Sequence, residues 1–179
     1  MKTMHKWFWA WEFEEEEQWL AALAEQGLAL KAVGFCRYDF EECAPGEYAV
    51  RLQRLAKPVR KPESQEYITF VEETGAEYIG TVNQWVYFRK RTEEGPFELF
   101  SDAASRIRQL DGLLCFLLPL AVLNLFIGLQ NLVMYHTVGL SANLIGILNL
   151  ALCGLISCGA ARLWNRRKRL KQENELFEN

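Results

Sequence analysis

The sequence predicts an α+β domain of the ferredoxin-like type, followed by a transmembrane helical hairpin. One observation is a stretch, residues 112–161, that contains no Asp, Glu, Lys or Arg although 24% of the chain is charged. A second is the order of the patterns before that stretch: strand, helix, strand, strand, helix, strand, with a short strand appended. This order is typical of a split βαβ fold, in which an antiparallel sheet carries two helices on one face.

The uncharged stretch divides into two apolar runs, at about residues 113–135 and 140–163. Each run is close to the ~20 residues that a helix needs to cross a bilayer. We therefore expect four parts along the chain. These are a soluble domain over residues 1–101, a helical stalk over 102–112, the transmembrane hairpin over 113–164 and a basic tail over 165–179.

The charges around the apolar runs predict the orientation of the hairpin. Residues 1–111 hold 14 Lys+Arg against 20 Asp+Glu, a net charge of −6, and residues 162–179 hold 6 against 3, a net charge of +3. Basic residues lie at the outer ends of both runs, and the connection between the runs has none. The positive-inside rule therefore places both termini in the cytoplasm. The N-terminal region has no apolar signal segment, so we expect a cell-membrane protein with two spans and a cytoplasmic domain.

The first segment of the domain, Lys6–Phe13, is dense in aromatic residues. A strand there would place Trp7, Trp9 and Trp11 on one face. The glutamates at 14–17 then open a helix, because acidic side chains favour the positive end of the helix dipole. These four carboxylates could form a cation site or a charged first turn, and the charged turn is the simpler interpretation.

The rest of the domain alternates strand and helix patterns that are separated by turns. A hairpin is expected around Pro45-Gly46, and a helix is expected between a cap at Ser64 and a stop at Gly75. The expected elements are strands at 28–40 and 47–55, a helix from Ser64, strand character at 76–91 that Asn83 can divide by a hairpin or a bulge, and a short strand at 97–100.

Charge, cysteine content and motifs exclude several classes of function. An acidic domain lacks the clustered Lys and Arg of a nucleic-acid surface. Three of the five cysteines lie in the apolar runs, and neither histidine is near a cysteine pair, so we expect no disulfide framework and no zinc site. No phosphate-binding loop, paired-histidine helix motif or GxSxG turn is present. We therefore expect a non-enzymatic protein without a metal or cofactor.

The row formed by Trp7, Trp9 and Trp11 is the main candidate for a binding surface. Large rings supply the apolar area that a small domain needs, so core packing is the simpler interpretation. The alternative is that part of the row is exposed and contacts a protein partner, a second copy of the chain or a flat ligand.

Polar residues inside the apolar runs are predicted to hold the two helices together. Antiparallel pairing about residue 137 places Asn124 opposite Asn149, and Asn131 opposite Asn143. Hydrogen bonds between such amides across the hairpin would contribute to helix association in lipid.

A basic cluster follows the second apolar run. We expect it to rest on the anionic inner leaflet of the bilayer. The alternatives are that it only sets the topology, or that it folds back onto the glutamates at 14–17. Its members are Arg166, Arg167, Lys168, Arg169 and Lys171.

Several motifs of the domain are familiar. They are Lys6-Trp7-Phe8 with Glu12 and Glu15, Trp19-Leu20 with Gly27, Gly46-x-Tyr48, Trp85-x-Tyr87-Phe88-Arg89-Lys90 and Phe97-Glu98-Leu99-Phe100-Ser101-Asp102. Over about residues 6–107 they resemble the uncharacterised family labelled domain of unknown function 2812. The resemblance implies a small bacterial membrane protein with a cytoplasmic domain and helical spans, often encoded beside a PadR-type transcriptional regulator. It implies no activity and no catalytic residues.

Two functions fit these observations. The first is a membrane-anchored regulatory or signalling module that binds a protein partner or a second copy of itself. The second is a membrane-tethered sensor that holds a small molecule against the sheet. A flat exposed aromatic patch would favour the first, and a deep apolar cleft with a few convergent polar groups would favour the second.

Overall fold

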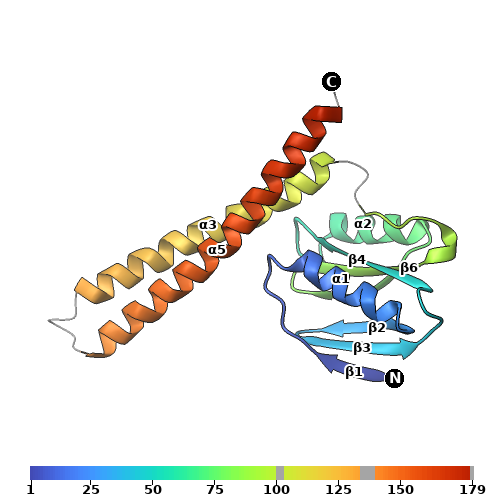
Figure 1. Ribbon diagram of the computed structural model, residues 1–179, viewed down its shortest axis with the longest axis horizontal. Helices are drawn as coiled ribbons and strands as arrows, with labels where there is room; N and C mark the ends of the chain where they lie inside the picture. Colours follow the sequence, from blue (N-terminus) through green and yellow to red (C-terminus); the bar gives the residue numbers. More distant parts are fainter. Residues whose placement is uncertain (100–102, 134–139, 178–179) are drawn as a thin grey trace. The chain divides into compact units, whose positions relative to one another are not determined.

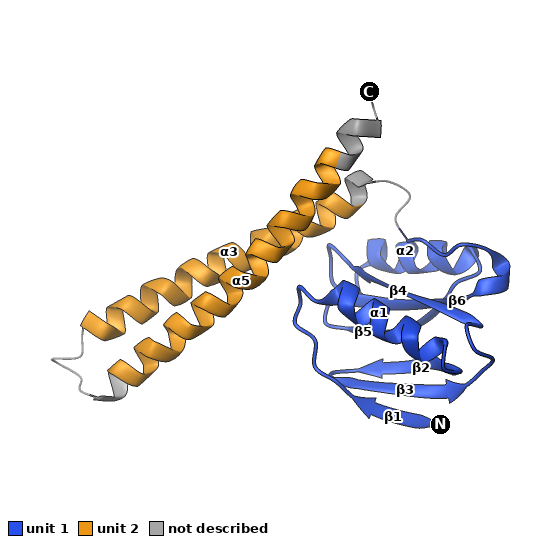
Figure 2. Cartoon of the chain, in the orientation of Figure 1, with its two compact units in different colours: residues 1–101 blue, residues 102–179 orange. Residues whose placement is uncertain are grey.

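The computed structural model describes residues 1–99, 103–133 and 140–177. The chain divides into two units, residues 1–101 and residues 102–179 (Figure 2). Each unit has its own packing, and the two are described in turn.

Six strands of the first unit form two antiparallel sheets of three strands each (Figure 1). Sheet 1 has the order β1-β3-β2 and sheet 2 has the order β4-β6-β5. The sequence predicted one sheet, so the number of sheets differs from the prediction. The elements are β1 (Lys2–His5), α1 (Phe13–Ala24), β2 (Leu28–Gly34), β3 (Arg37–Glu42), β4 (Tyr48–Arg54), α2 (Pro62–Glu73), β5 (Glu77–Val82), β6 (Trp85–Arg91) and the short 3-10 helix η1 (Thr92–Glu94).

The two sheets belong to two halves that repeat the same arrangement. Each half runs strand, helix, strand, strand, and in each the last strand lies in the middle of the sheet. The register also repeats: Leu30 pairs with Phe40 in the first half, and Tyr78 pairs with Phe88, 48 residues later in both strands. Both hairpins contain a bulge directly after this pair. We call residues 2–42 the first half and residues 48–91 the second half.

Helix α1 packs against both sheets, whose edge strands β2 and β5 lie side by side, and α2 packs against the other face of sheet 2 (Figure 1). On β6, Val86 and Phe88 pack with Ile68 of α2, whereas Tyr87 packs with Leu20 of α1. Successive residues of a strand point to opposite faces, so α1 and α2 cover opposite faces of sheet 2. The prediction that both helices lie on one face is therefore wrong. Sheet 2 is buried on both faces, whereas a single helix covers sheet 1.

Sheet 1 keeps a polar outer face. Its inner residues Tyr38 and Phe40 are buried in the core with α1. On the other face Asp39 accepts a hydrogen bond from the Thr3 hydroxyl and forms an ion pair of 3.0 Å with Arg37. This alternation of apolar and polar residues is typical of an antiparallel sheet with one solvated face.

Several local elements differ from those that the sequence predicts. The aromatic segment after His5 is not a strand, and β1 precedes it. The strand expected at 28–40 divides at a two-residue turn, in which Cys36 has a φ of 54°. The strands that flank Pro45-Gly46 do not pair, because β3 and β4 lie in different sheets. Asn83, with a φ of 56°, does divide the region 76–91 into a hairpin.

The end regions of the second half also differ in detail. Helix α2 begins at Pro62, a residue suited to the first turn of a helix, and not at a Ser64 cap. The Ser64 hydroxyl donates instead to the carbonyl of Lys57. Residues 97–99 form no strand, although the Phe97 ring is buried in the core beside α2. Phe100 and the cap expected at Ser101-Asp102 lie outside the described residues.

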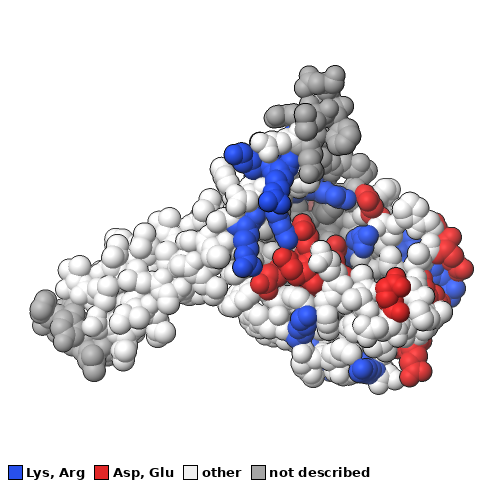
Figure 3. All heavy atoms as spheres, viewed as in Figure 1, with Lys and Arg blue, Asp and Glu red and all other residues white. Residues whose placement is uncertain are grey.

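The second unit is a hairpin of two long helices, α3 (Ala103–Val133) and α5 (Leu140–Phe177). Both are long and apolar enough to cross a membrane, over Arg106–Val133 and Asn143–Gln172. Figure 3 shows a surface without charged side chains over most of the hairpin, and basic side chains gathered at one end. The helices approach closely at two glycines, since a Cβ at Gly146 would lie 3.0 Å from the Gly128 carbonyl oxygen. The connection at 136–139 lies outside the described residues.

Candidate functional site

A cavity of about 270 Å³ opens between the two halves of the first unit. Its walls are formed by the segment 6–10 before α1, the start of α1 and the turns of both β-hairpins. The two turns lie at equivalent positions of the two halves, and the segment 6–10 supplies most of the aromatic residues. The lining residues are Lys6, Trp7, Phe8, Trp9, Ala10, Phe13, Glu16, Gly34, Phe35, Cys36, Tyr38, Val82, Asn83, Trp85 and Tyr87.

Glu16 is the buried polar group of this cavity, with 7% of the residue exposed. Its Oε1 accepts hydrogen bonds from the hydroxyls of Tyr38 and Tyr87, both at 2.7 Å. Tyr38 belongs to sheet 1 and Tyr87 to sheet 2, so one carboxylate oxygen joins α1 to both sheets. Its Oε2 accepts no hydrogen bond from any residue that the structure describes.

The protonation of this group follows from its burial. Loss of hydration raises the pKa of Glu16, and the two tyrosine hydrogen bonds oppose this shift without cancelling it. Burial and the neighbouring carboxylate also raise the pKa of Tyr38 and of Tyr87. Both hydroxyls therefore keep their protons and act as donors, which leaves Glu16 as the titrating member of the cluster.

Aromatic rings form the outer wall of the cavity. Trp7 contacts Trp9 and Phe35 edge-on, with ring centroids 5.4 and 5.7 Å apart, and Trp9 stacks on Trp11 at 5.3 Å. Trp11 is buried, so core packing explains this member of the row. Trp7 and Trp9 are 53% and 37% exposed. The row is therefore divided between core and surface, and a partner-contact face stays a prediction for its exposed part.

Lys6 is the basic residue of the cavity wall. Its Nζ lies 4.7 Å from the ring centroids of both Phe8 and Trp19. This distance is well within the range of a cation–π contact. The aromatic wall therefore already holds one ammonium group of the chain itself.

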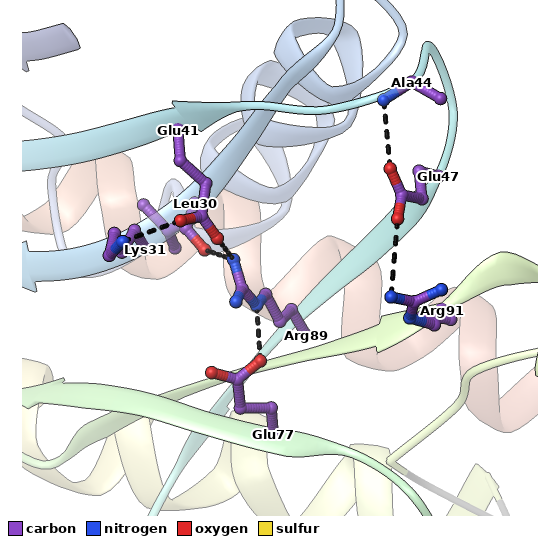
Figure 4. A network of polar contacts seen from close by, with 8 residues as sticks. All are labelled: Leu30, Lys31, Glu41, Ala44, Glu47, Glu77, Arg89 and Arg91. Atoms are coloured by element: carbon purple, nitrogen blue, oxygen red, sulfur yellow. Dashed lines mark hydrogen bonds and ion pairs between the residues drawn. The ribbon is translucent and has the colours of Figure 1, made fainter. Parts of the chain in front are cut away.

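A second polar cluster, around Arg89, ties the halves together at the other end of the strands (Figure 4). The Arg89 guanidinium donates to Glu77 at 2.7 Å, to Glu41 at 2.8 Å and to the backbone carbonyl of Leu30 at 2.9 Å. Its plane also lies over the Tyr48 ring, at 4.7 Å. Two of the three guanidinium nitrogens, Nε and Nη1, are thus engaged with protein groups, so the cluster joins the two halves.

The glutamates of the run 14–17 lie in different environments, which the sequence does not indicate. Glu16 is buried in the cavity, and Glu17 accepts a 2.6 Å hydrogen bond from the backbone N–H of Leu52 in β4. This bond satisfies a donor on an edge strand of sheet 2. A signal for Glu16 was present, because it shares its helix face with the apolar residues Leu20 and Leu23. Among the described residues no group of three His, Cys, Asp or Glu could hold a metal ion.

The asparagines that are predicted to pair across the hairpin form hydrogen bonds within their own helices. The side-chain amides of Asn124, Asn131 and Asn149 each donate to the carbonyl four residues earlier in their own helix. Asn124 is nevertheless buried, whereas the Asn149 bond is exposed. Pairing of Asn124 with Asn149, and of Asn131 with Asn143, through their remaining groups stays a prediction.

Arg167, a member of the predicted basic cluster, has a protein partner in α3. Arg167 forms an ion pair with Asp111, which joins α5 to α3, and its guanidinium lies 5.5 Å from the Trp164 ring. The sequence predicts Arg167 on the leaflet and indicates no role for Asp111. For the other four members a position on anionic lipid stays a prediction.

Comparison with known proteins places the chain in a family. No curated protein and no solved structure matches it. A family model does match, over residues 12–122, which is more than half of the 179 residues and reaches from the start of α1 into α3. The chain therefore belongs to the family described as "Protein of unknown function (DUF2812)".

Proposed function

We propose that this protein is a membrane-anchored sensor: a non-enzymatic domain that binds a small molecule in the cavity beside Glu16. The observation that carries the proposal is the cavity itself, which combines aromatic walls with a buried carboxylate at hydrogen-bond distance from two hydroxyls. Its volume is near the lower end of the ~300–1,000 Å³ of ligand pockets, so the occupant is small. An apolar cleft with few convergent polar groups is the feature that favours a sensor over a flat docking surface.

The position of the cavity suits a sensing role. Its walls come from both halves, so an occupant would bear on the hairpin turns of both sheets at once. A ligand that binds one arrangement of these turns better than another shifts the population between them. We propose that this shift is what the protein reports to a regulatory partner.

The anchor and the orientation complete the proposal. Two apolar helices support a position in the cell membrane. The basic residues that flank them, and the positive-inside rule, support a cytoplasmic location for both termini and for the first unit. A reporter fused after Asn179 should be active inside the cell, and activity only outside would contradict this orientation.

A protein-binding module is the second candidate function. The rings of Trp7 and Phe35 are 53% and 70% exposed and touch each other edge-on. Exposed aromatic residues that form a contiguous patch often mark protein–protein contacts. In this alternative the same edge of the cavity docks a protein partner or a second copy of the chain, and the cavity itself stays empty.

Native mass spectrometry of the full chain, released from native membranes, tests the choice between the two. The cavity-filling variant Ala10→Trp should lose a bound small molecule that the wild type retains. Ala22→Trp adds the same ring to an exposed position of α1 away from the cavity, and should keep the ligand. A small molecule that stays bound in Ala10→Trp would contradict the proposal. A protein that co-purifies with the wild type and with Ala10→Trp but not with Trp7→Ala would favour the second candidate.

A further inference from the structure

We infer that the cavity selects an organic cation: an ammonium group placed against Glu16 and carried on a small apolar or aromatic body held by the rings. This inference rests on the proposed function, since it names the class of ligand for the same cavity. It follows from three features of the described residues: the negative charge inside the cavity, the aromatic side chains of its wall and the lack of an ion pair between Glu16 and any described residue.

The charge inside the cavity is that of one carboxylate. Among the described lining residues Glu16 is the only acid and Lys6 the only base. No ion pair joins Glu16 to any residue that the structure describes. A buried carboxylate without a cation is costly, and two neutral hydroxyls lower that cost only in part. A ligand that brings a positive charge therefore gains more at this position than a neutral ligand of the same shape.

The geometry of the hydrogen bonds leaves room for that charge. Both hydroxyls donate to Oε1 and so fix the plane of the carboxylate, whereas Oε2 has no donor among the described residues. An ammonium group near Oε2 would complete the coordination of Glu16 without displacing either tyrosine. Tyr38 and Tyr87 thus act as positioning residues for the carboxylate.

The wall of the cavity is suited to the same class of ligand. It presents the rings of three tryptophans (Trp7, Trp9 and Trp85) and three phenylalanines (Phe8, Phe13 and Phe35). Ring faces attract cations, and tryptophan does so most strongly. The Lys6 ammonium is an example of this attraction, since it lies 4.7 Å from the ring centroid of Phe8 in this wall and at the same distance from the ring centroid of Trp19. Lys6 is itself exposed, so the inner end of the cavity, at Glu16, stays available.

Isothermal titration calorimetry on the full chain in nanodiscs of neutral lipid tests the inference. The probe is benzyltrimethylammonium, and the matched neutral probe is neopentylbenzene, in which a carbon replaces the nitrogen. Phenylacetate serves as the anionic probe. Empty nanodiscs give the heat of partition into lipid, which is subtracted from each titration.

The variant Glu16→Gln removes the charge and keeps an oxygen that can accept both hydroxyls. Glu15→Gln removes the same charge from an exposed position next to it. We expect the cation to bind the wild type and Glu15→Gln about tenfold or more tightly than its neutral isostere does, and Glu16→Gln to abolish this preference. Thermal unfolding of both variants confirms that they are folded.

The outcomes separate the inference from the proposed function. Equal binding of the cation and the neutral isostere to the wild type, lost in Ala10→Trp, would overturn the inference and keep a small-molecule site. Tighter binding of phenylacetate would assign recognition to Lys6 and overturn the inference as well. Failure of all three probes to bind the wild type would count against both the inference and the proposed cavity.

Discussion

The two halves of the first unit share a topology and differ in what covers their sheets. The first half, residues 2–42, buries one face of sheet 1 and leaves Asp39 and Arg37 on the other. The second half, residues 48–91, buries both faces of sheet 2, where Tyr87 replaces an outward polar residue at the position equivalent to Asp39. Equivalent backbones therefore do not imply equivalent environments, because α1 packs on two sheets and α2 on one.

The groups that join the halves are not repeated. Glu16 of α1 contacts tyrosines from both sheets, whereas Ser64, at the equivalent position of α2, donates its hydroxyl to the carbonyl of Lys57 within the second half. The halves also meet at Glu41 and Arg89, which are equivalent positions with opposite charges. The cavity and the Arg89 cluster thus arise from the asymmetry between the halves and not from the shared topology.

The comparison is tested most strongly at its two central phenylalanines. Phe40 and Phe88 are equivalent and fully buried, each next to the helix of its own half. Phe40→Ala and Phe88→Ala should each lower the free energy of unfolding by about 3–5 kcal/mol, through lost transfer energy and a residual cavity. Denaturant titration of the full chain in micelles measures both. A cost that is much smaller in one half would show that this half is loosely packed.

Arg89 tests whether the halves depend on their polar contact. Arg89→Met removes a buried guanidinium and leaves the Leu30 carbonyl and the partly exposed carboxylates of Glu77 and Glu41 without it, at an expected cost of about 1–3 kcal/mol. Lys31→Met breaks the exposed ion pair with the same Glu41 and should cost about 1 kcal/mol or less. Equal costs in the same titration would contradict a special role for the contact between the halves.

Glu16 sharpens the comparison through its pH dependence. Below its ordinary pKa of 4.5 the carboxyl is protonated in both the folded and the unfolded chain, and its burial carries no charge penalty. Because the pKa of Glu16 is raised in the folded chain, stability is lost as the pH rises from 4.5 through that raised pKa. The groups around it are the hydroxyls of Tyr38 and Tyr87, which stay protonated there, and the Lys6 ammonium at the cavity wall.

Glu16→Gln should therefore gain stability over the wild type as the pH rises across this window. Each unit by which the pKa is raised contributes about 1.4 kcal/mol to the difference. The unfolding free energies of both proteins, measured at several pH values between about pH 4 and pH 8, give the dependence of stability on pH. Glu15→Gln is the control and should follow the wild type. A constant difference between Glu16→Gln and the wild type at all pH values would contradict a raised pKa.

The smallest expected effect concerns the two hairpin turns. Cys36 and Asn83 both have a positive φ, near 55°, which asparagine tolerates better than cysteine. Cys36→Gly should therefore raise the melting temperature slightly, by the equivalent of about 0.5 kcal/mol, whereas Asn83→Gly should be close to neutral. Calorimetry of the two variants would detect this difference, and a larger gain for Asn83→Gly would contradict the local explanation.

The elements that were predicted correctly are those with local signals. The acidic run before Leu20 and Leu23, and the glycine stop at Gly75, predicted helices, and the uncharged stretch predicted the two long apolar helices of the second unit. Asn83 predicted a hairpin or a bulge, because its side chain tolerates a positive φ, and the structure has the hairpin. Each of these signals depends on residues within a few positions of one another.

The arrangement of the sheets could not be predicted in the same way, because strand pairing is decided between distant residues. The pattern around Pro45-Gly46 is compatible with a hairpin, but β3 pairs with β1 and β2 and so has no free edge for β4. Cys36 gave no turn signal, since cysteine rarely adopts a positive φ. Glu16 was missed because it lies within a run of four glutamates, and the sequence alone does not distinguish a buried glutamate from the others in such a run.

The polar outer face of sheet 1 also bears on how the first unit ends. A further helix on this face would have to cover Asp39 and the two side chains that bind it, Arg37 and Thr3. Burial of these polar groups would cost free energy without the gain of apolar contacts. The polar face thus acts as a cap at this end of the unit.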